Sequence, residues 1–258
     1  MTKHFIASGC SFTEYKGWPY VIPDYFSDVE LHNVGMASQG NGFIARKAQY
    51  KIFELLDKGV SPKDIFVGIM WSGVARMEFF FEDMWEEPKN TDGWCPNAGN
   101  PSHFIPEADG AWFIFDLNWS NPIAKEWTQS KFSNAGAYLI RTYEYLLSTQ
   151  NFCKSLGIDY FYTQFNRHVI EDTHDDDLNL SWMRKMIDWD QWLPVDGNGC
   201  YEWVFLNSTK PWGPNLGGTS LSEMTIDTFR HPTIEQHAEF CEQVVVPFLR
   251  QRPWGQDK

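Results

Sequence analysis

The stretch Ile6-Ala7-Ser8-Gly9-Cys10-Ser11-Phe12-Thr13-Glu14 decides how this chain folds at its amino end. A short apolar run from His4 to Ala7 leads into Gly9 and then Ser11. This pattern predicts a strand that ends in a tight turn, with the Ser11 hydroxyl projecting from the carboxyl edge of a sheet. Open α/β sheets bind their ligands along that edge. Ser11 is therefore a candidate functional residue.

Working outward from this turn, strands and helices alternate. Apolar runs and helical spacing predict strands over Lys3 to Ser8, Val29 to Val34 and Ile65 to Trp71, with a short helix over Tyr20 to Phe26 and a longer one from about Asn41 to Lys58 that Gly59 caps. Further along, the expected elements are a helix over Lys131 to Leu156, a strand over Ile158 to Phe165, a helix over Ser181 to Trp192, a turn-rich stretch over Asp196 to Gly218 and a final helix over Thr233 to Arg250, with Pro232 suited to its first turn. This order predicts an α/β fold, a three-layer α/β/α sandwich with a central parallel sheet.

Regular spacing is lost between about residues 78 and 130, which predicts an aromatic-rich insertion or lid within a single domain of residues 1–258. Five tryptophans fall in this region: Trp85, Trp94, Trp112, Trp119 and Trp127. They can form a platform for a sugar, a lid over an acyl pocket, or a loop that packs on itself.

Composition narrows the function classes. The formal net charge of −13 disfavours binding to a phosphate backbone, so no nucleic-acid partner is expected. The five scattered cysteines contain no Cys-x-x-Cys pair and indicate reduced thiols. No signal peptide and no membrane-spanning run is recognised, so the expected location is cytoplasmic or phage-associated, with export by a dedicated machine left open. His168 and His174 flank Asp175-Asp176-Asp177 without metal-ligand spacing, so a solvated acidic loop is expected and no metal or other cofactor is predicted.

A serine hydroxyl becomes a nucleophile when a base takes its proton and a carboxylate holds that base in the right tautomer. The stretch Asp227-Thr228-Phe229-Arg230-His231-Pro232 offers both partners. Ser11, His231 and Asp227 are therefore the expected catalytic residues. Cys10 is expected to point away from Ser11 and to be a buried structural residue, and His237, in the final helix, to be a packed histidine.

These motifs resemble those of the SGNH hydrolases, also called the GDSL family, over the whole chain and in order. The first block of the family, Gly-Asp-Ser, is matched by Gly9-Cys10-Ser11, with Cys10 in place of Asp, and the Gly-Cys-Ser-Phe-Thr form looks like a branch common among bacteriophage and marine bacterial members. The second block is matched by the stretch Asn33 to Asn41 and the last by Asp227 to Pro232. The resemblance implies a flavodoxin-like topology and esterase or acyl hydrolase activity.

The resemblance also implies an oxyanion hole built from the backbone N–H of Ser11, the backbone N–H of Ser38 or Gly40, and one polar side chain. The third block, Gly-x-Asn-Asp, is absent, since Met70-Trp71-Ser72-Gly73 stands where it should follow the third strand. Ser72 can donate from its hydroxyl instead, or Asn41 can reach in from the neighbouring loop. Three residues separate Asp227 from His231 where the family has two, so another acid can take the role of Asp227.

Arg76 follows the third strand, where it can be a solvated side chain at the start of a helix or can bind an anionic group of a substrate. The expected function is hydrolysis of a carboxylic ester, an O-acetyl group on a carbohydrate among the candidates, through an acyl-enzyme and without a cofactor. The alternative is a non-catalytic SGNH-like binding or structural protein associated with a phage particle, which the missing asparagine favours. Neither the acyl group nor the oligomeric state follows from the sequence.

Overall fold

The centre of the fold is a five-stranded sheet in which all neighbouring strands are parallel. The computed structural model describes residues 2–14, 16–37, 39–74, 76–82, 104–107, 110–116, 135–167, 180–194, 196–210 and 231–256. The strand order is β2-β1-β3-β7-β8, with bounds β1 (Lys3–Gly9), β2 (Val29–Asn33), β3 (Ile65–Trp71), β7 (Asp159–Gln164) and β8 (Trp192–Leu193). The predicted α/β class with a parallel sheet is confirmed.

Strand β1 lies between the two strands that follow it in sequence, β2 and β3. The chain therefore runs first to one side of β1 and then to the other. In an open parallel sheet this change of direction leaves a crevice at the carboxyl ends of the strands, where ligands bind. Ser11 follows directly after β1 and so stands at this switch point.

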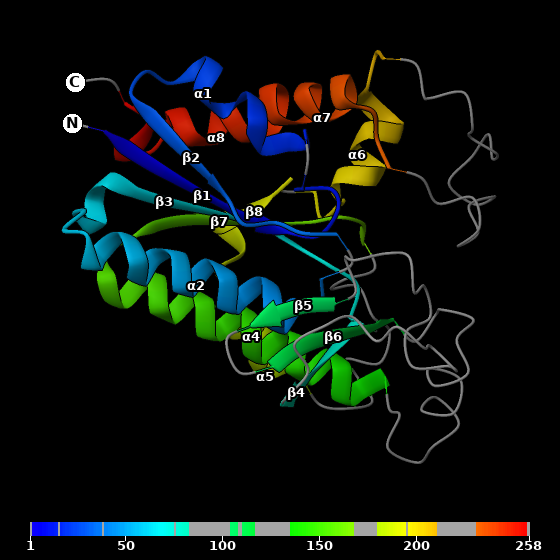
Figure 1. Cartoon of the computed structure of the whole chain (residues 1–258). Coiled ribbons are helices and arrows are strands. Elements are labelled where there is room, and N and C mark those ends of the chain that lie inside the picture. Colours follow the sequence, from blue (N-terminus) through cyan, green and yellow to red (C-terminus); the bar gives the residue numbers. More distant parts are fainter. Residues whose placement is uncertain are drawn as a thin grey trace.

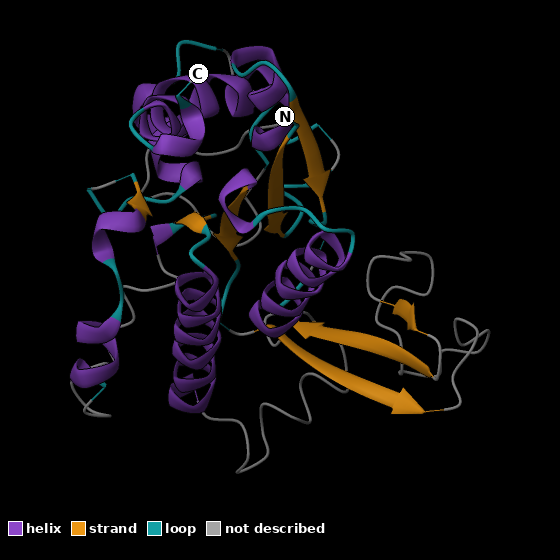
Figure 2. Ribbon diagram, turned by 90° about the vertical axis from the view of Figure 1, so that its left-hand side faces the viewer, coloured by secondary structure: helices purple, strands orange, loops and turns teal. Residues whose placement is uncertain are grey.

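Helices cover both faces of the sheet, as Figures 1 and 2 show, which gives three layers. One face packs against α2 (Asn41–Asp57), α4 (Ala135–Leu156) and α5 (Ser181–Met186). The other packs against α1 (Ile22–Tyr25), α6 (Cys200–Asn207), α7 (Ile234–Phe240), a π-helical segment (Cys241–Val245) and α8 (Val246–Arg250). Short 3₁₀ turns complete the fold at Trp18–Val21, Pro62–Asp64, Trp189–Gln191 and Pro253–Gly255.

Strand β3 explains why the sheet needs both layers. Every one of its residues is buried, so the strand has no solvent-facing side. Val67 and Ile69 enter the core under α2 and α4, whereas Phe66 and Met70 enter the core under the carboxyl-terminal helices. A continuous apolar run of this kind is typical of a central strand in a parallel sheet.

The region after β3 differs from the expectation. The structure has strands β4 (Arg76–Glu82), β5 (Phe104–Glu107) and β6 (Gly110–Asp116), which form a three-stranded antiparallel sheet in the order β4-β6-β5. The expected loss of regular structure and a helix starting at Arg76 are therefore wrong for these residues, because runs of aromatic residues favour strands. Of the five tryptophans, Trp112 lies on β6, and Trp85, Trp94, Trp119 and Trp127 lie outside the described residues. The role of residues 78–130 as a lid stays a prediction.

Three further corrections concern the carboxyl-terminal half. Residues Cys200–Asn207 form helix α6 where turns were expected, and Trp192 lies in strand β8 and not in a helix. The final helix is confirmed, although its middle is π-helical. Thr233 is its N-cap, since its Oγ1 accepts a hydrogen bond from Gln236 N and Gln236 Oε1 accepts one from Thr233 N, so Pro232 precedes the helix. No helix in the described part of the chain has the length and apolar character that crossing a membrane requires.

Candidate active site

The turn after β1 is held by its own backbone and by close packing. Cys10 O accepts hydrogen bonds from Thr13 N (2.9 Å) and Glu14 N (3.1 Å). Gly9 has no room for a side chain, because a Cβ there would lie 2.2 Å from Thr13 Oγ1 and 2.9 Å from Met70 O. Cys10 is only 1% exposed and packs in the core, as predicted.

The loop after β2 is tied to this turn through Asn33, the first residue of the second motif. Asn33 Nδ2 donates to Thr13 O (2.6 Å), and Asn33 Oδ1 accepts from Gly35 N (2.9 Å). Met36 N donates to Gly9 O (3.0 Å) and extends the same link. The backbone and side chain of Asn33 to Met36 therefore hold the turn that carries Ser11.

Ser11 and His231 meet in space although 220 residues separate them. Ser11 Oγ lies 2.5 Å from His231 Nε2, and the hydroxyl can donate to this nitrogen when Nε2 carries no proton. His231 stands two residues before Thr233, so the capped start of α7 fixes the backbone that carries the imidazole. The structure thus brings together two residues that the sequence singled out as nucleophile and base.

The surroundings of His231 favour the neutral imidazole. The residue is exposed at one edge, but its ring packs against Phe12 with a centroid distance of 4.9 Å. Desolvation lowers the pKa of His231 below its ordinary value, and the positive charge of Arg76 lowers it further. A neutral Nε2 is the form that accepts the serine proton.

Ser11 and His231 open into a pocket of about 340 Å³. Its other lining residues are Glu14, Lys16, Gly17, Pro232, Ile234 and His237. Glu14 Oε2 accepts a hydrogen bond from Ala37 N (2.7 Å), and burial raises the pKa of its carboxyl group. Glu14 and Lys16 were not recognised as pocket residues from the sequence, although Glu14 lies three positions after Ser11 in the same turn.

His237 is a packed histidine, as predicted. It is 5% exposed, and its ring meets the ring of Phe12 edge to face. Burial lowers its pKa to about 3, with a further contribution from His231. His237 is therefore a neutral wall of the pocket at neutral pH.

The two candidate side-chain donors, Asn41 and Ser72, are hydrogen-bonded to each other. Asn41 Oδ1 accepts from Ser72 N (2.8 Å), and Asn41 Nδ2 donates to Ser72 O (3.0 Å) and Thr142 Oγ1 (3.2 Å). Ser72 Oγ in turn accepts from Arg76 Nη1 (2.7 Å). Neither Asn41 nor Ser72 is among the described residues that line the Ser11 pocket, and their role as oxyanion donors stays a prediction.

Arg76 lies at the edge of the candidate site. Its guanidinium carbon is 5.9 Å from the ring centroid of Phe165, and this ring meets Phe12, which packs on His231. The effect of Arg76 on the His231 pKa places its positive charge within electrostatic reach of the imidazole. Arg76 is thus a cation near the imidazole, in addition to Lys16, which lines the pocket itself.

Gly40, one of the two candidate backbone donors, is the N-cap of α2. The carboxylate of Glu78 on β4 accepts from Phe43 N (2.9 Å) in the first turn of this helix. A Cβ at Gly40 would lie 2.4 Å from Glu78 Oε1 and 3.0 Å from Arg76 O, so only glycine leaves room for this approach. Ser38 and Asp227 lie outside the described residues, and their predicted roles are not placed.

The pocket has no metal-ligand set within the described ranges. The single group of three metal-ligating side chains found there, His4, Glu30 and His32, lies at the other end of β1.

No family model matches this sequence, and no curated protein matches it.

Proposed function

We propose that this protein is a serine-dependent hydrolase of carboxylic esters that works through an acyl-enzyme. The observation that carries the proposal is the 2.5 Å contact between Ser11 Oγ and His231 Nε2 at the mouth of an open pocket. A neutral imidazole beside a serine hydroxyl is the arrangement that activates such a nucleophile. The position at the switch point of a parallel sheet also supports it.

In this mechanism Ser11 Oγ attacks the ester carbonyl while its proton passes to His231 Nε2. The resulting tetrahedral intermediate collapses, the bond to the leaving alkoxide breaks, and His231 returns the proton to that oxygen. Water then attacks the acyl-Ser11 ester and loses a proton to His231. The bond between the acyl carbon and Ser11 Oγ breaks, His231 returns the proton to Ser11 Oγ, and the acid leaves. We assign Asp227 to orient the imidazole, in line with the motif that it shares with His231.

The oxyanion would be held by the backbone N–H of Ser11 and that of Gly40 or Ser38. No acceptor for the Ser11 or Gly40 N–H is found among the described residues. The guanidinium of Arg76 supplies positive charge within electrostatic reach of His231, and we propose that this charge helps to offset the missing asparagine. The same charge suits an anionic group on the substrate.

The substrate class that we favour is an acyl or O-acetyl ester, with a carbohydrate as the alcohol. Glu14 and Lys16 bring a carboxylate and an ammonium group to the wall of the pocket, and both can hydrogen-bond to sugar hydroxyls. The tryptophans of residues 78–130 are the source of the carbohydrate hypothesis.

A non-catalytic binding or structural protein, phage-associated as the motif resemblance implies, is the second candidate. The observation that favours it is the engagement of Asn41 and Ser72 with each other and with Thr142 and Arg76. Loss of one oxyanion donor lowers the rate by about two to three orders of magnitude.

A fluorophosphonate probe separates the two candidates. The hydrolase predicts an adduct on Ser11, located by mass spectrometry, that is lost in Ser11→Ala and in His231→Ala. The matched control is Ser155→Ala, at an exposed serine on α4 whose hydroxyl donates to Phe152 O, and it should be labelled like the wild type. Folded protein without an adduct would overturn the hydrolase proposal and favour a binding role.

A further inference from the structure

Three side chains with metal-ligating atoms converge on the edge of the sheet. In the parallel register of β1 and β2, His4 is opposite Glu30 and Ile6 is opposite His32. Opposite residues, and residues two apart on one strand, project from the same face of a sheet. His4, Glu30 and His32 therefore share the face that α2 covers, near the amino end of β1 and away from Ser11, which follows its carboxyl end.

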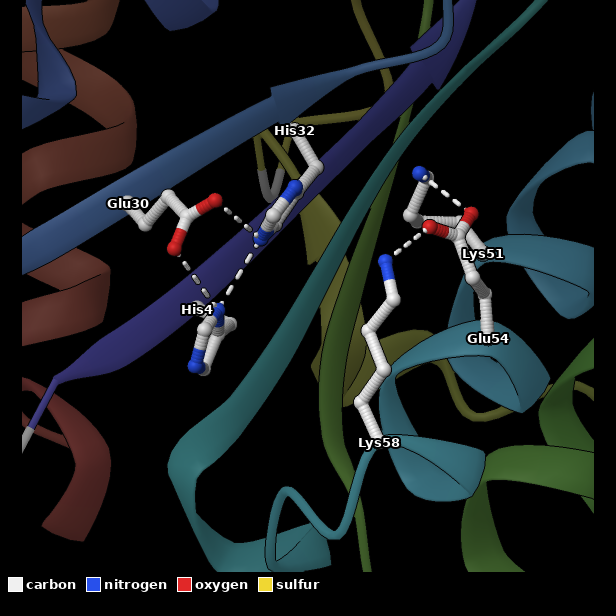
Figure 3. Close-up of polar contacts among 6 residues, drawn as sticks. All are labelled: His4, Glu30, His32, Lys51, Glu54 and Lys58. Atoms are coloured by element: carbon white, nitrogen blue, oxygen red, sulfur yellow. Dashed lines mark hydrogen bonds and ion pairs between the residues drawn. The ribbon is translucent and has the colours of Figure 1, made fainter.

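Figure 3 shows the three groups pointing toward one another. His4 Nδ1 lies 3.0 Å from His32 Nε2, and the two rings stack with centroids 5.2 Å apart. The carboxylate of Glu30 faces both rings, with Oε2 at 3.6 Å from His4 Nδ1 and Oε1 at 3.6 Å from His32 Nε2. All three ligand atoms lie within 4.8 Å of one another.

The two ring nitrogens and the carboxylate offer more lone pairs than there are protons between them. One proton suffices for the hydrogen bond between the two ring nitrogens, and the imidazole that accepts it is neutral. The Glu30 carboxylate, which is an acceptor only, then stands 3.6 Å from both nitrogens, beyond hydrogen-bond distance. Three converging electron-pair donors with one negative charge among them suit a cation better than a proton.

We propose that His4, Glu30 and His32 bind one divalent transition-metal ion, with zinc as the best match. Two nitrogens bound to zinc at about 2.1 Å are about 3.0–3.4 Å apart for angles of 90–110°. The distance of 3.0 Å between His4 Nδ1 and His32 Nε2 falls in this range. At the same angles a carboxylate oxygen and an imidazole nitrogen on one zinc ion are about 2.9–3.5 Å apart. The two oxygens of Glu30, each 3.6 Å from one ring nitrogen, therefore need only a small movement of this exposed side chain to bind the ion.

The neighbouring charges permit a cation. Lys51 and Glu54 of α2 act electrostatically on His32. Lys51 Nζ is bound to Glu54 Oε2 at 2.6 Å, and Lys58 Nζ binds the other oxygen of Glu54, as Figure 3 also shows. Both ammonium groups that act on the proposed ligands, Lys51 on His32 and Lys58 on Glu30, are therefore paired with the carboxylate of Glu54. Glu30 is 57% exposed, which leaves a path for the metal and a coordination position for water.

The consequence of binding is structural. The ion would join the edge strand β2 to the central strand β1 through side chains, in addition to the backbone ladder. Because an ion that binds only the folded chain stabilises it by mass action, zinc should raise the melting temperature of the protein.

Titration of the tag-free, metal-stripped chain with zinc chloride tests the proposal, with calorimetry for stoichiometry and visible absorption of the cobalt(II) form for imidazole ligation. We expect one zinc ion per chain and a higher melting temperature. Loss of a second-shell partner already lowers metal affinity by about 10–100-fold, so Glu30→Gln and His32→Asn should each weaken binding by at least about 100-fold. Glu144→Gln, at an exposed glutamate on α4, is the matched control and should bind like the wild type.

Glu30→Gln keeps the test interpretable if His32→Asn fails to fold, because Glu30 is exposed on an edge strand. Circular dichroism of each variant before titration establishes folding. Absence of saturable binding to the wild type would overturn the proposal and leave a hydrogen-bonded imidazole pair. Binding that survives Glu30→Gln and His32→Asn unchanged would overturn it equally, since the ion would then lie elsewhere.

Discussion

His231 can act as a base only while its imidazole is neutral, and Arg76 contributes to that state. Desolvation and the positive charge of Arg76 both lower the pKa of His231 below its ordinary value. The neutral form therefore persists to a lower pH than in a free histidine, and base catalysis is lost only as the pH falls through this lowered pKa.

Replacing Arg76 with glutamine should raise the His231 pKa, because a repulsive positive charge is removed while burial remains. The acid limb of the rate of fluorophosphonate labelling should then move to higher pH. Arg184→Gln on α5, whose guanidinium stacks on Trp189, is the control and should leave the limb in place. An unchanged acid limb in Arg76→Gln would refute an electrostatic effect of Arg76 on the base.

Substitution of Gly9 tests whether close packing at the end of β1 supports the turn that carries Ser11. In Gly9→Ala the added Cβ would meet Thr13 Oγ1 and the main-chain oxygen of Met70, and a carbonyl in β3 cannot move without disturbing the sheet. We expect a loss of about 1–3 kcal/mol in the free energy of unfolding, measured with urea, and weaker labelling of Ser11. Gly73→Ala is the control, since its Cβ would have Phe165 at 3.8 Å as nearest neighbour. Equal stability of the two variants would contradict the steric argument.

At the scale of elements, Asn41 joins α2 to the end of β3. It starts the helix, is 2% exposed, and exchanges two hydrogen bonds with the backbone of Ser72. Asn41→Ala would leave the N–H and C=O of Ser72 without these partners, and Ser72 is fully buried.

We expect Asn41→Ala to lower the free energy of unfolding by about 1–3 kcal/mol, since unsatisfied buried backbone groups cost that much. Urea denaturation measures it. Asn207→Ala removes an exposed asparagine that donates only to Trp203 O, and should change stability by less than about 0.5 kcal/mol. A similar loss in both variants would show that the buried position of Asn41 is not what matters.

Sequence patterns predicted best those elements whose burial is uniform or whose end is marked by a specific residue. Strand β3 has the predicted bounds because a wholly apolar run between turn residues is buried on both faces. Helix α2 begins at the predicted residue and ends one residue early, and Gly59 has the positive φ of 83° that terminates a helix.

Helix α6 was missed for a physical reason. Its first five residues, Cys200 to Val204, are all buried, so polar and apolar residues do not alternate with a helical period. Its N-cap is Gly199, which pattern analysis counts as a turn residue. Among the described residues, strands β4 to β6 pair with one another, and their aromatic runs were the local signal that the expected loss of regular structure overlooked.

Sequence motifs singled out two residues of the candidate site, Ser11 and His231, but not the other residues that line the pocket. Ser11 and His231 each stand beside a recognisable element boundary, and the fold brings them together. Glu14 lines the same pocket because of how the turn after β1 folds, and His237 because of the face of α7 on which it lies. Short sequence motifs contain neither kind of information. Asn41 was expected as a donor, but its partners come from β3 and α4, distant parts of the chain.

At the scale of the whole molecule, desolvated histidines link stability to pH. The pKa of His237 is lowered to about 3 by burial, and that of His231 is lowered too. Below the ordinary histidine pKa these histidines bind protons in the unfolded chain but not in the folded chain. The free energy of unfolding is therefore highest above about pH 6.5 and falls as the pH drops.

His237 should contribute a loss of about 2 kcal/mol in the free energy of unfolding between pH 6.5 and pH 5. His237→Leu removes this titration, so the variant should lose less stability than the wild type over the same interval, whatever its stability at pH 7. Urea denaturation at both pH values measures the difference. Parallel pH profiles of the wild type and His237→Leu would contradict a buried neutral His237.

The separation of 220 residues between Ser11 and His231 has a consequence during synthesis. A ribosome makes Ser11 220 residues before it makes His231. Until α7 has been made and packs on the sheet, His231 is not beside the hydroxyl, which remains an ordinary alcohol. A chain that terminates before His231 would carry the same serine without this base, so labelling of Ser11 would report only on molecules extended at least to His231.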